Sequence, residues 1–126
     1  MKDNQQKGIR VLIVDDERLA RRNLKGLLEE HSYVRIVGEA RNITEAEKIL
    51  GELPVDLVFL DIQMPGGSGF DLLKRLECRP NVIFVTAHDQ YVTRASGSQA
   101  LDCLLKPVDP DRLGESLQKA LLLIET

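Results

Sequence analysis

Five short apolar runs alternate along this chain with segments whose apolar residues recur at helical spacing. Such alternation is typical of repeated strand–helix units, and it predicts a parallel β-sheet with helices packed against it. The predicted strands are Ile9–Val14, Val34–Glu39, Asp56–Leu60, Val82–Val85 and Leu101–Leu105. The sequence therefore indicates five consecutive strand–helix units.

The polarity of the runs orders the strands within the sheet. The first, third and fourth runs are almost continuously apolar, as expected of strands that are covered on both faces. Arg35 interrupts the second run and Asp102 the fifth, so we expect these two strands at the edges. Short connections and right-handed crossovers then favour the order 2-1-3-4-5, counted along the chain. This is an α/β fold, a flavodoxin-like (βα)5 doubly wound parallel sheet.

Four of the five predicted helices carry a clear apolar stripe. In chain order, the stripes comprise Ala20, Leu24, Leu27 and Leu28; Ile43, Ala46, Ile49, Leu50 and Leu53; Phe70, Leu73 and Leu76; and Leu113, Leu117, Ala120, Leu121 and Ile124. The fourth helix, from about Gln90 to Gly97, has only Val92 and Ala95, with Tyr91 nearby, and it breaks at Ser96-Gly97-Ser98. We expect this helix to be the least firmly packed element.

Length and composition narrow the class of protein. The 126 residues suit one domain, with an apolar and charged content that is ordinary for a soluble globular protein. No apolar stretch approaches the roughly 20 residues needed to span a bilayer, and the start is too polar for a signal peptide. We therefore expect a cytoplasmic protein without membrane contact, in which Cys78 and Cys103 are free thiols. A net charge of -3 and a pI near 5.4 argue against direct contact with nucleic acid.

Charged residues stand at the carboxyl ends of three predicted strands: Asp15 and Asp16 after the first, Asp61 after the third and Lys106 after the fifth. In an open parallel sheet these ends share one edge, where functional groups gather beside the reversal of strand order. A carboxylate there can attack a phosphoryl donor and become an aspartyl phosphate, provided that the surrounding negative charge is neutralised. Clustered carboxylates offer the oxygen ligands that suit Mg²⁺. Lys106 supplies a fixed positive charge, and Thr86, at the end of the fourth strand, supplies a hydroxyl donor.

Each of these residues also has a purely structural alternative. Asp61 could be a turn residue, and Asp16 could cap a helix that starts near Glu17. Lys106 could be a solvated lysine at the edge of the sheet, and the hydroxyl of Thr86 could bond its own backbone. Their convergence on one edge favours the interpretation as a metal-assisted phosphoryl-transfer site.

Two further features border this edge. The bond between Lys106 and Pro107 can be cis, which would aim the lysine at the site; the alternative is a trans proline that ends the strand. The segment Met64-Pro-Gly-Gly-Ser-Gly69 can turn sharply, because glycine accepts positive φ.

Gln63 and His88 stand two residues after Asp61 and Thr86, respectively. By this spacing we expect them to flank the path of a water that attacks a phosphoryl group on Asp61.

Four motifs follow one another along the chain: Val14-Asp15-Asp16-Glu17, Leu60-Asp61-Ile62-Gln63-Met64-Pro65, Val85-Thr86-Ala87 and Leu105-Lys106-Pro107. On these motifs, the chain resembles the receiver domain of two-component response regulators, and the resemblance runs from Ile9 to Glu125. The stretches Asp15–Arg21, Val37–Ala40 and Asp61–Gly66 look most like receivers that precede a LytTR-type (LytR/AlgR-like) DNA-binding domain.

The resemblance implies that Asp61 accepts a phosphoryl group from a histidine kinase. The implied ligands of Mg²⁺ are Asp15, Asp16, Asp61 and the backbone carbonyl of Gln63, and the implied ligands of the phosphoryl oxygens are Thr86 and Lys106. We expect residues 1–126 to form one receiver domain that regulates a C-terminal effector, a DNA-binding transcription regulator, outside this chain. No enzyme activity is expected beyond self-phosphorylation from small phosphodonors and autodephosphorylation.

The chain departs from the family pattern at the positions that usually read out phosphorylation. Receivers of this kind usually carry an aromatic residue three positions before the lysine, where it changes rotamer on activation, and here that position is Cys103. Gly67 stands where a large apolar residue is common, and Arg94-Ala-Ser-Gly-Ser98 lacks the aromatic that tends to follow the alanine. We therefore expect readout through movement of the fourth helix, with self-association through the fourth helix, fifth strand and fifth helix.

Two other functions remain open. A pseudo-receiver would act only as a docking or dimerisation module, which the change at Cys103 permits and the intact acidic cluster disfavours. A phosphatase of the haloacid-dehalogenase type would also use an aspartyl phosphate, but it needs a second acid two residues after the nucleophile, where this chain has Gln63.

Overall fold

Five parallel strands form one sheet in the computed structural model, which describes residues 8–76, 80–92 and 99–124. The strands are β2 (Ile9–Val14), β3 (Val34–Ala40), β4 (Leu57–Asp61), β5 (Asn81–Thr86) and β6 (Asp102–Leu105). Their order is β3-β2-β4-β5-β6, and every neighbouring pair is parallel. Counted along the chain this is the order 2-1-3-4-5, so the predicted doubly wound topology is confirmed.

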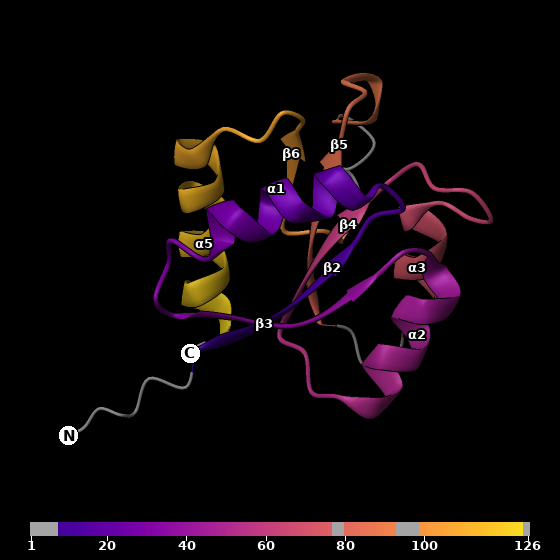
Figure 1. The fold of residues 1–126 in the computed structure, drawn as a ribbon, viewed down its shortest axis with the longest axis horizontal. Helices are drawn as coiled ribbons and strands as arrows, with labels where there is room; N and C mark the ends of the chain where they lie inside the picture. The colour runs from indigo at the N-terminus through magenta and orange to yellow at the C-terminus, as the bar shows by residue number, and fades with distance from the viewer. Residues whose placement is uncertain (1–7, 77–79, 93–98, 125–126) are drawn as a thin grey trace.

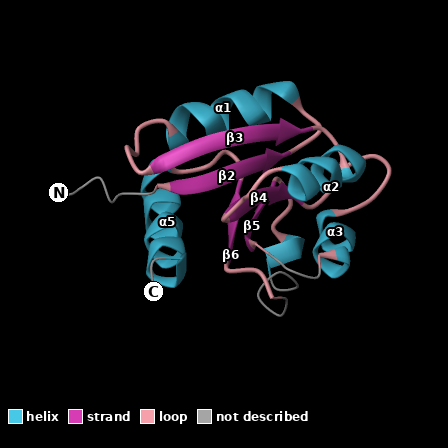
Figure 2. Cartoon of the chain, turned by 90° about the horizontal axis from the view of Figure 1, so that it is seen from below, coloured by secondary structure: helices cyan, strands magenta, loops and turns pink. Residues whose placement is uncertain are grey.

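Helices pack on both faces of the sheet. Figures 1 and 2 show α1 (Arg18–Leu28) and α5 (Pro110–Ile124) on one face, and α2 (Ile43–Glu52) and α3 (Gly69–Arg75) on the other. A parallel strand that is covered on both faces needs apolar residues throughout, and all five residues of β4 are buried. The central position of β4 therefore follows from its composition.

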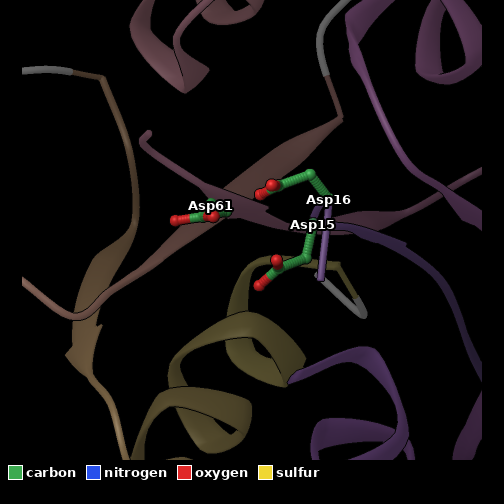
Figure 3. A group of neighbouring side chains, drawn as sticks. All are labelled: Asp15, Asp16 and Asp61. Atoms are coloured by element: carbon green, nitrogen blue, oxygen red, sulfur yellow. The ribbon is translucent and has the colours of Figure 1, made fainter. Parts of the chain in front are cut away.

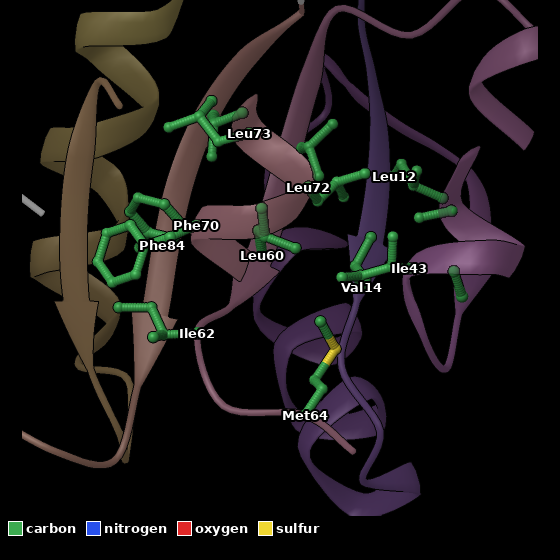
Figure 4. Packing of buried hydrophobic residues seen from close by; sticks show 14 residues of the cluster. Leu12, Val14, Ile43, Leu60, Ile62, Met64, Phe70, Leu72, Leu73 and Phe84 are labelled. Atoms are coloured by element: carbon green, nitrogen blue, oxygen red, sulfur yellow. The ribbon is translucent and has the colours of Figure 1, made fainter. Parts of the chain in front are cut away.

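Strand alternation divides the core into two clusters. Leu12, Val14, Val58 and Leu60 point to the face of α2 and α3, where they meet Ile43 and Phe70 (Figure 4). Their neighbours in sequence, among them Ile13 and Phe59, point to the face of α1 and α5. The predicted apolar stripes supply the helical side of both clusters, except for Ala20 and Leu53, which belong to neither; Leu53 is 43% exposed.

The observed strand ends differ from the predicted ones by one residue in several places. β4 begins at Leu57 and ends on Asp61, and β5 ends on Thr86. Asp61 and Thr86 are therefore the last residues of their strands. Asp56 lies just before β4, and its carboxylate accepts hydrogen bonds from the backbone and guanidinium of Arg10, at 2.8 to 3.0 Å. The shift leaves the predicted site at the same edge of the sheet.

The charged residue of the edge strand β6, Asp102, faces helix α5. Asp102 is half-buried, and its carboxylate accepts hydrogen bonds from Ser116, Arg112 and Lys119 of α5. Burial alone would raise the pKa of Asp102, but these donors and the backbone N–H of Cys103 lower it. The residue that marks the edge in the sequence thus also fastens α5 to the sheet.

The predicted fourth helix lies mostly outside the described residues. The chain turns into helical conformation at Gln90–Val92, while residues 93–98, with the predicted Ser96-Gly97-Ser98 break, are not described. Cys78 is also among the residues left out, whereas Cys103 is a free thiol. Among the described helices, none combines the length and the apolar composition needed to cross a bilayer.

Candidate functional site

Three carboxylates meet at the carboxyl edge of the sheet. Asp15 and Asp16 follow β2, Asp61 ends the neighbouring strand β4, and oxygen atoms from all three lie within 4.8 Å of one another (Figure 3). Asp15 and Asp61 are only 5% and 6% exposed, whereas Asp16 is exposed. The predicted acidic group therefore exists, with two buried members and one that faces solvent.

Lys106 reaches into this group from the end of β6. Its Nζ lies 2.8 Å from Asp15 Oδ2, 3.8 Å from Asp61 Oδ2 and 3.7 Å from Glu17 Oε1. The side chain is 19% exposed, and the peptide bond to Pro107 is cis. The alternative of a solvated edge lysine is therefore wrong, because the ammonium is held among carboxylates.

The negative charge of the site exceeds its positive charge. Burial, followed by repulsion from Asp15, raises the pKa of Asp61 from 3.8 to about 7; Lys106 and the backbone N–H of Gln63 act in the opposite direction. Burial alone would lower the pKa of Lys106, but its hydrogen bond to Asp15 and the attraction of Asp61 raise it. A divalent cation that binds oxygen ligands would relieve the repulsion among the carboxylates.

The start of α1 separates the roles of the two adjacent aspartates. The residue before the helix is Glu17, which makes no side-chain cap, and its backbone N–H donates to Asp15 Oδ1 at 2.9 Å. The alternative that Asp16 caps this helix is therefore wrong. Arg21 donates to the backbone carbonyl of Asp15 at 2.7 Å and also pairs with Glu39, so it fixes the backbone of the acidic pair.

Thr86 is fully buried at the end of β5. Its Oγ1 accepts a hydrogen bond from the backbone N–H of His88 at 3.1 Å, so the predicted alternative of a hydroxyl bonded to nearby backbone is present. Accepting this bond leaves the hydroxyl proton available for donation. The two interpretations of Thr86 are thus compatible.

Glycines and a capping box shape the loop that follows Asp61. Gly66 has φ of +89°, and a Cβ on Gly69 would lie 2.5 Å from the backbone oxygen of Asp61. Ser68 and Asp71 then exchange hydrogen bonds at the start of α3. The backbone N–H of Gly69 donates to the carbonyl of Ile62 at 2.8 Å, which closes the loop, and the backbone of Gln63 stays hydrogen-bonded to Asp61.

Three further residues lie near the site, although no sequence pattern assigns them to it. Glu17 pairs with Lys106, Arg21 supports Asp15, and the hydroxyl of Tyr91 accepts a hydrogen bond from Gln63 Nε2 at 2.8 Å. Tyr91 is distant from Gln63 in sequence, so neither spacing nor periodicity could have indicated this contact. His88 is exposed, and its ring lies edge-on to that of Tyr91, with centroids 6.1 Å apart.

Comparison with protein families gives a match over most of the chain. The family model described as the response regulator receiver domain matches residues 11–118. This range contains every residue of the site described above.

Curated relatives share nearly half of the aligned residues. An uncharacterized response regulatory protein from Vibrio cholerae is 48% identical over 112 residues, covering 87% of this chain and 47% of the relative. The transcriptional regulatory protein BtsR from Escherichia coli is 47% identical over 113 residues, covering 88% of this chain and 47% of that protein. This chain thus spans about half the length of the curated relatives it matches.

A solved structure shows the same fold. The response regulatory domain of protein mrkE from Klebsiella pneumoniae superimposes with a TM-score of 0.82 at 33% sequence identity, and the match covers 93% of this chain and 98% of that domain.

Proposed function

The chain belongs to the receiver domain family of two-component response regulators, and on that premise we propose that Asp61 is its phosphoacceptor. The observation that carries this proposal is the position of Asp61: a buried carboxylate at a strand end, with two other carboxylates and an ammonium group within reach. The donor would be a histidine kinase. A phosphoryl group on Asp61 would set the activity of an effector.

The residues around Asp61 fit a Mg²⁺ ion. The proposed ligands are the carboxylates of Asp15, Asp16 and Asp61 and the backbone carbonyl of Gln63. Mg²⁺ prefers such hard oxygen ligands and usually keeps some of its waters, which suits a cluster whose third carboxylate faces solvent. When bound, the ion would neutralise the charge of the carboxylates and of the incoming phosphoryl oxygens.

The protein's own groups account for the transfer step. A carboxylate oxygen of Asp61 attacks phosphorus, the bond from phosphorus to the donor's imidazole nitrogen breaks, and the electron pair of that bond remains on the imidazole. Lys106 neutralises charge on the phosphoryl oxygens. Its 2.8 Å hydrogen bond to Asp15 holds the ammonium group in place before the phosphoryl group arrives. The hydroxyl of Thr86 donates a hydrogen bond to one of those oxygens.

Intact-mass measurement after incubation with Mg²⁺ and acetyl phosphate tests this function. We expect one phosphoryl group on the parent and none on Asp61→Asn, and labelling should be lost when the metal is chelated. A variant that is labelled as fully as the parent would refute the assignment. An unlabelled parent would favour the alternative of a docking module without phosphorylation.

A surface beside Lys106 supports the proposed kinase partner. A groove between α1 and the residues after β6 has an apolar lining made mainly by Leu19, Ala20, Leu24, Leu27, Pro107 and Val108. Leu19 is 70% exposed there, although it is a large apolar residue. We propose that a helix of the kinase lies in this groove and presents its phosphohistidine to Asp61.

The effector is proposed to be a LytTR-type DNA-binding domain outside residues 1–126, which would form one receiver domain. Three sequence stretches support this assignment, as does the name of the relative that is called a transcriptional regulatory protein. Full-length protein should bind a promoter of its own regulon more tightly after phosphorylation. Binding that is equal with and without the phosphoryl group would argue against this type of effector.

Readout is proposed to involve self-association through the fourth helix, β6 and α5. Leu105, at the end of β6, is 44% exposed, and Cys103 replaces the usual aromatic residue in the same strand. Hydrogen exchange with and without beryllofluoride should show changes concentrated between about Ala87 and Leu105. Changes confined to the loop after Asp61, without a change in oligomeric state, would contradict this mode of readout.

A further inference from the structure

Tyr91 makes a contact with the loop after Asp61 that no sequence motif indicates. Its hydroxyl accepts a 2.8 Å hydrogen bond from the side-chain amide of Gln63, which lies 28 residues earlier. Gln63 is exposed and stands two residues after Asp61. Without this bond, an exposed glutamine side chain would sample several rotamers.

Tyr91 also contacts His88, which stands two residues after Thr86 on the other side of the site. Its ring meets the ring of His88 edge-on, at 6.1 Å and 88°, and its backbone N–H donates to the carbonyl of His88. The backbone N–H of His88 in turn donates to Thr86 Oγ1. One tyrosine therefore borders both residues that are expected to flank the path of an attacking water.

The position of Tyr91 is itself fixed from the core. Its ring lies 6.3 Å from that of Phe70, and Phe70 packs against the fully buried Phe84 at 4.9 Å. Tyr91 is half-buried against this cluster, with its hydroxyl directed to Gln63. The hydroxyl thus offers a rigid acceptor to a side chain that would otherwise be mobile.

We propose that Tyr91 is a positioning residue that prolongs the lifetime of the phosphoryl group, by holding the Gln63 side chain across the approach to Asp61. The inference rests on the proposed phosphorylation of Asp61. In the hydrolysis that Tyr91 slows, a water oxygen attacks phosphorus and the bond from phosphorus to the Asp61 oxygen breaks. The Asp61 carboxylate is regenerated, and inorganic phosphate leaves with both protons of the water.

Replacing Tyr91 by phenylalanine tests this role with little disturbance, since the ring and its contacts with Phe70 and His88 stay. After labelling with acetyl phosphate and removal of the donor, Tyr91→Phe should lose its phosphoryl group about 2- to 10-fold faster than the parent, the range expected for one lost hydrogen bond. Tyr33→Phe is the matched control, because Tyr33 lies beside His31 at the opposite end of the strands. Tyr33→Phe should lose its phosphoryl group at the same rate as the parent.

The same measurement in a second background separates positioning from general loosening. Gln63→Met keeps the length of the side chain and removes the amide donor, so adding Tyr91→Phe to it should change the rate no further. If the two substitutions change the hydrolysis rate independently, so that their factors multiply, the proposal is overturned. An unchanged or longer lifetime of the phosphoryl group in Tyr91→Phe alone would overturn it as well. A parent that takes no label would refute the proposed phosphorylation, and the inference with it, so the two failures are distinct.

Nuclear magnetic resonance reports on the contact without phosphorylation. In the parent, the Gln63 side-chain amide proton that bonds to Tyr91 should be shifted from its free-glutamine position and slow to exchange with solvent, and Tyr91→Phe should give it the shift and exchange rate of a free glutamine. Free-glutamine behaviour in the parent would overturn the proposal.

Discussion

The raised pKa of Asp61 predicts a specific dependence of stability on pH. Without metal, the carboxyl group has a pKa of about 7 in the folded protein, compared with 3.8 for an ordinary aspartate. Between these values the unfolded chain releases the proton while the folded protein keeps it. The contribution of Asp61 to the free energy of unfolding therefore falls as pH rises, by at most about 1.4 kcal/mol per pH unit, and levels off above pH 7. Over the whole interval the loss attributable to Asp61 approaches about 4 kcal/mol.

Asp61→Asn removes the titrating group at nearly constant shape. In chelator at pH 8 the variant should be more stable than the parent by about 2–4 kcal/mol, the lower figure allowing for screening of the charges by solvent. At pH 4 the two should agree to within about 1 kcal/mol, because the folded parent is then protonated at Asp61 and the unfolded chain has released that proton only in part. Adding Mg²⁺ should narrow the gap at pH 8, since a ligand of the folded state stabilises the parent.

Urea unfolding at several pH values, with and without Mg²⁺, measures these differences. Asp89→Asn serves as the control, because Asp89 is exposed and its replacement should change stability by no more than about 0.5 kcal/mol. An Asp61→Asn variant without added stability at pH 8 would refute the electrostatic reasoning. A gap of equal size at pH 4 and pH 8 would refute it as well.

Three further variants address the metal, the kinase and the lysine. Asp16→Ala should bind Mg²⁺ or Mn²⁺ at least 10-fold more weakly than the parent by titration, about 1.4 kcal/mol, because it removes the exposed ligand; equal affinity would deny Asp16 a role in metal binding. Leu19→Asp should slow phosphotransfer from a histidine kinase about 10-fold or more, as for a contact worth over 1 kcal/mol, without affecting labelling by acetyl phosphate. The control Leu122→Asp lies on α5 at a similar exposure, 69%, and should leave both reactions unchanged; equal effects of the two variants would refute the docking groove. Lys106→Met should lower stability above pH 7 by about 1–3 kcal/mol in urea unfolding, since it removes a charged hydrogen-bond partner of Asp15; an unchanged stability would mean that the pair contributes nothing.

The sequence predicted the elements that periodicity and polarity determine. Apolar runs gave the strands, Arg35 and Asp102 marked the edges, and the charged ends of the runs located Asp15, Asp61 and Lys106 at one edge. These predictions succeed because a parallel sheet brings all strand ends of one polarity together, whatever the details of the loops.

The sequence did not predict contacts that depend on how side chains meet across the fold. Arg21 and Glu39 are 18 residues apart, and Gln63 and Tyr91 are 28 apart, so no local pattern pairs them. The Asp16 cap was a reasonable alternative from sequence, but the helix begins one residue later than that alternative required, and the N–H of Glu17 bonds to Asp15 instead. Contacts between distant residues and the first residue of a helix are determined by packing and geometry rather than by composition.

Chemical trapping of the phosphorylated residue tests the central claim most directly. Borohydride reduces an acyl phosphate on an aspartate to homoserine, and peptide mass spectrometry then locates the converted residue. After labelling with Mg²⁺ and acetyl phosphate, homoserine should appear at position 61 alone, although Asp15 and Asp16 lie within the same cluster. Homoserine at position 15 or 16, or labelled protein without any homoserine, would contradict the assignment of Asp61 as the phosphoacceptor.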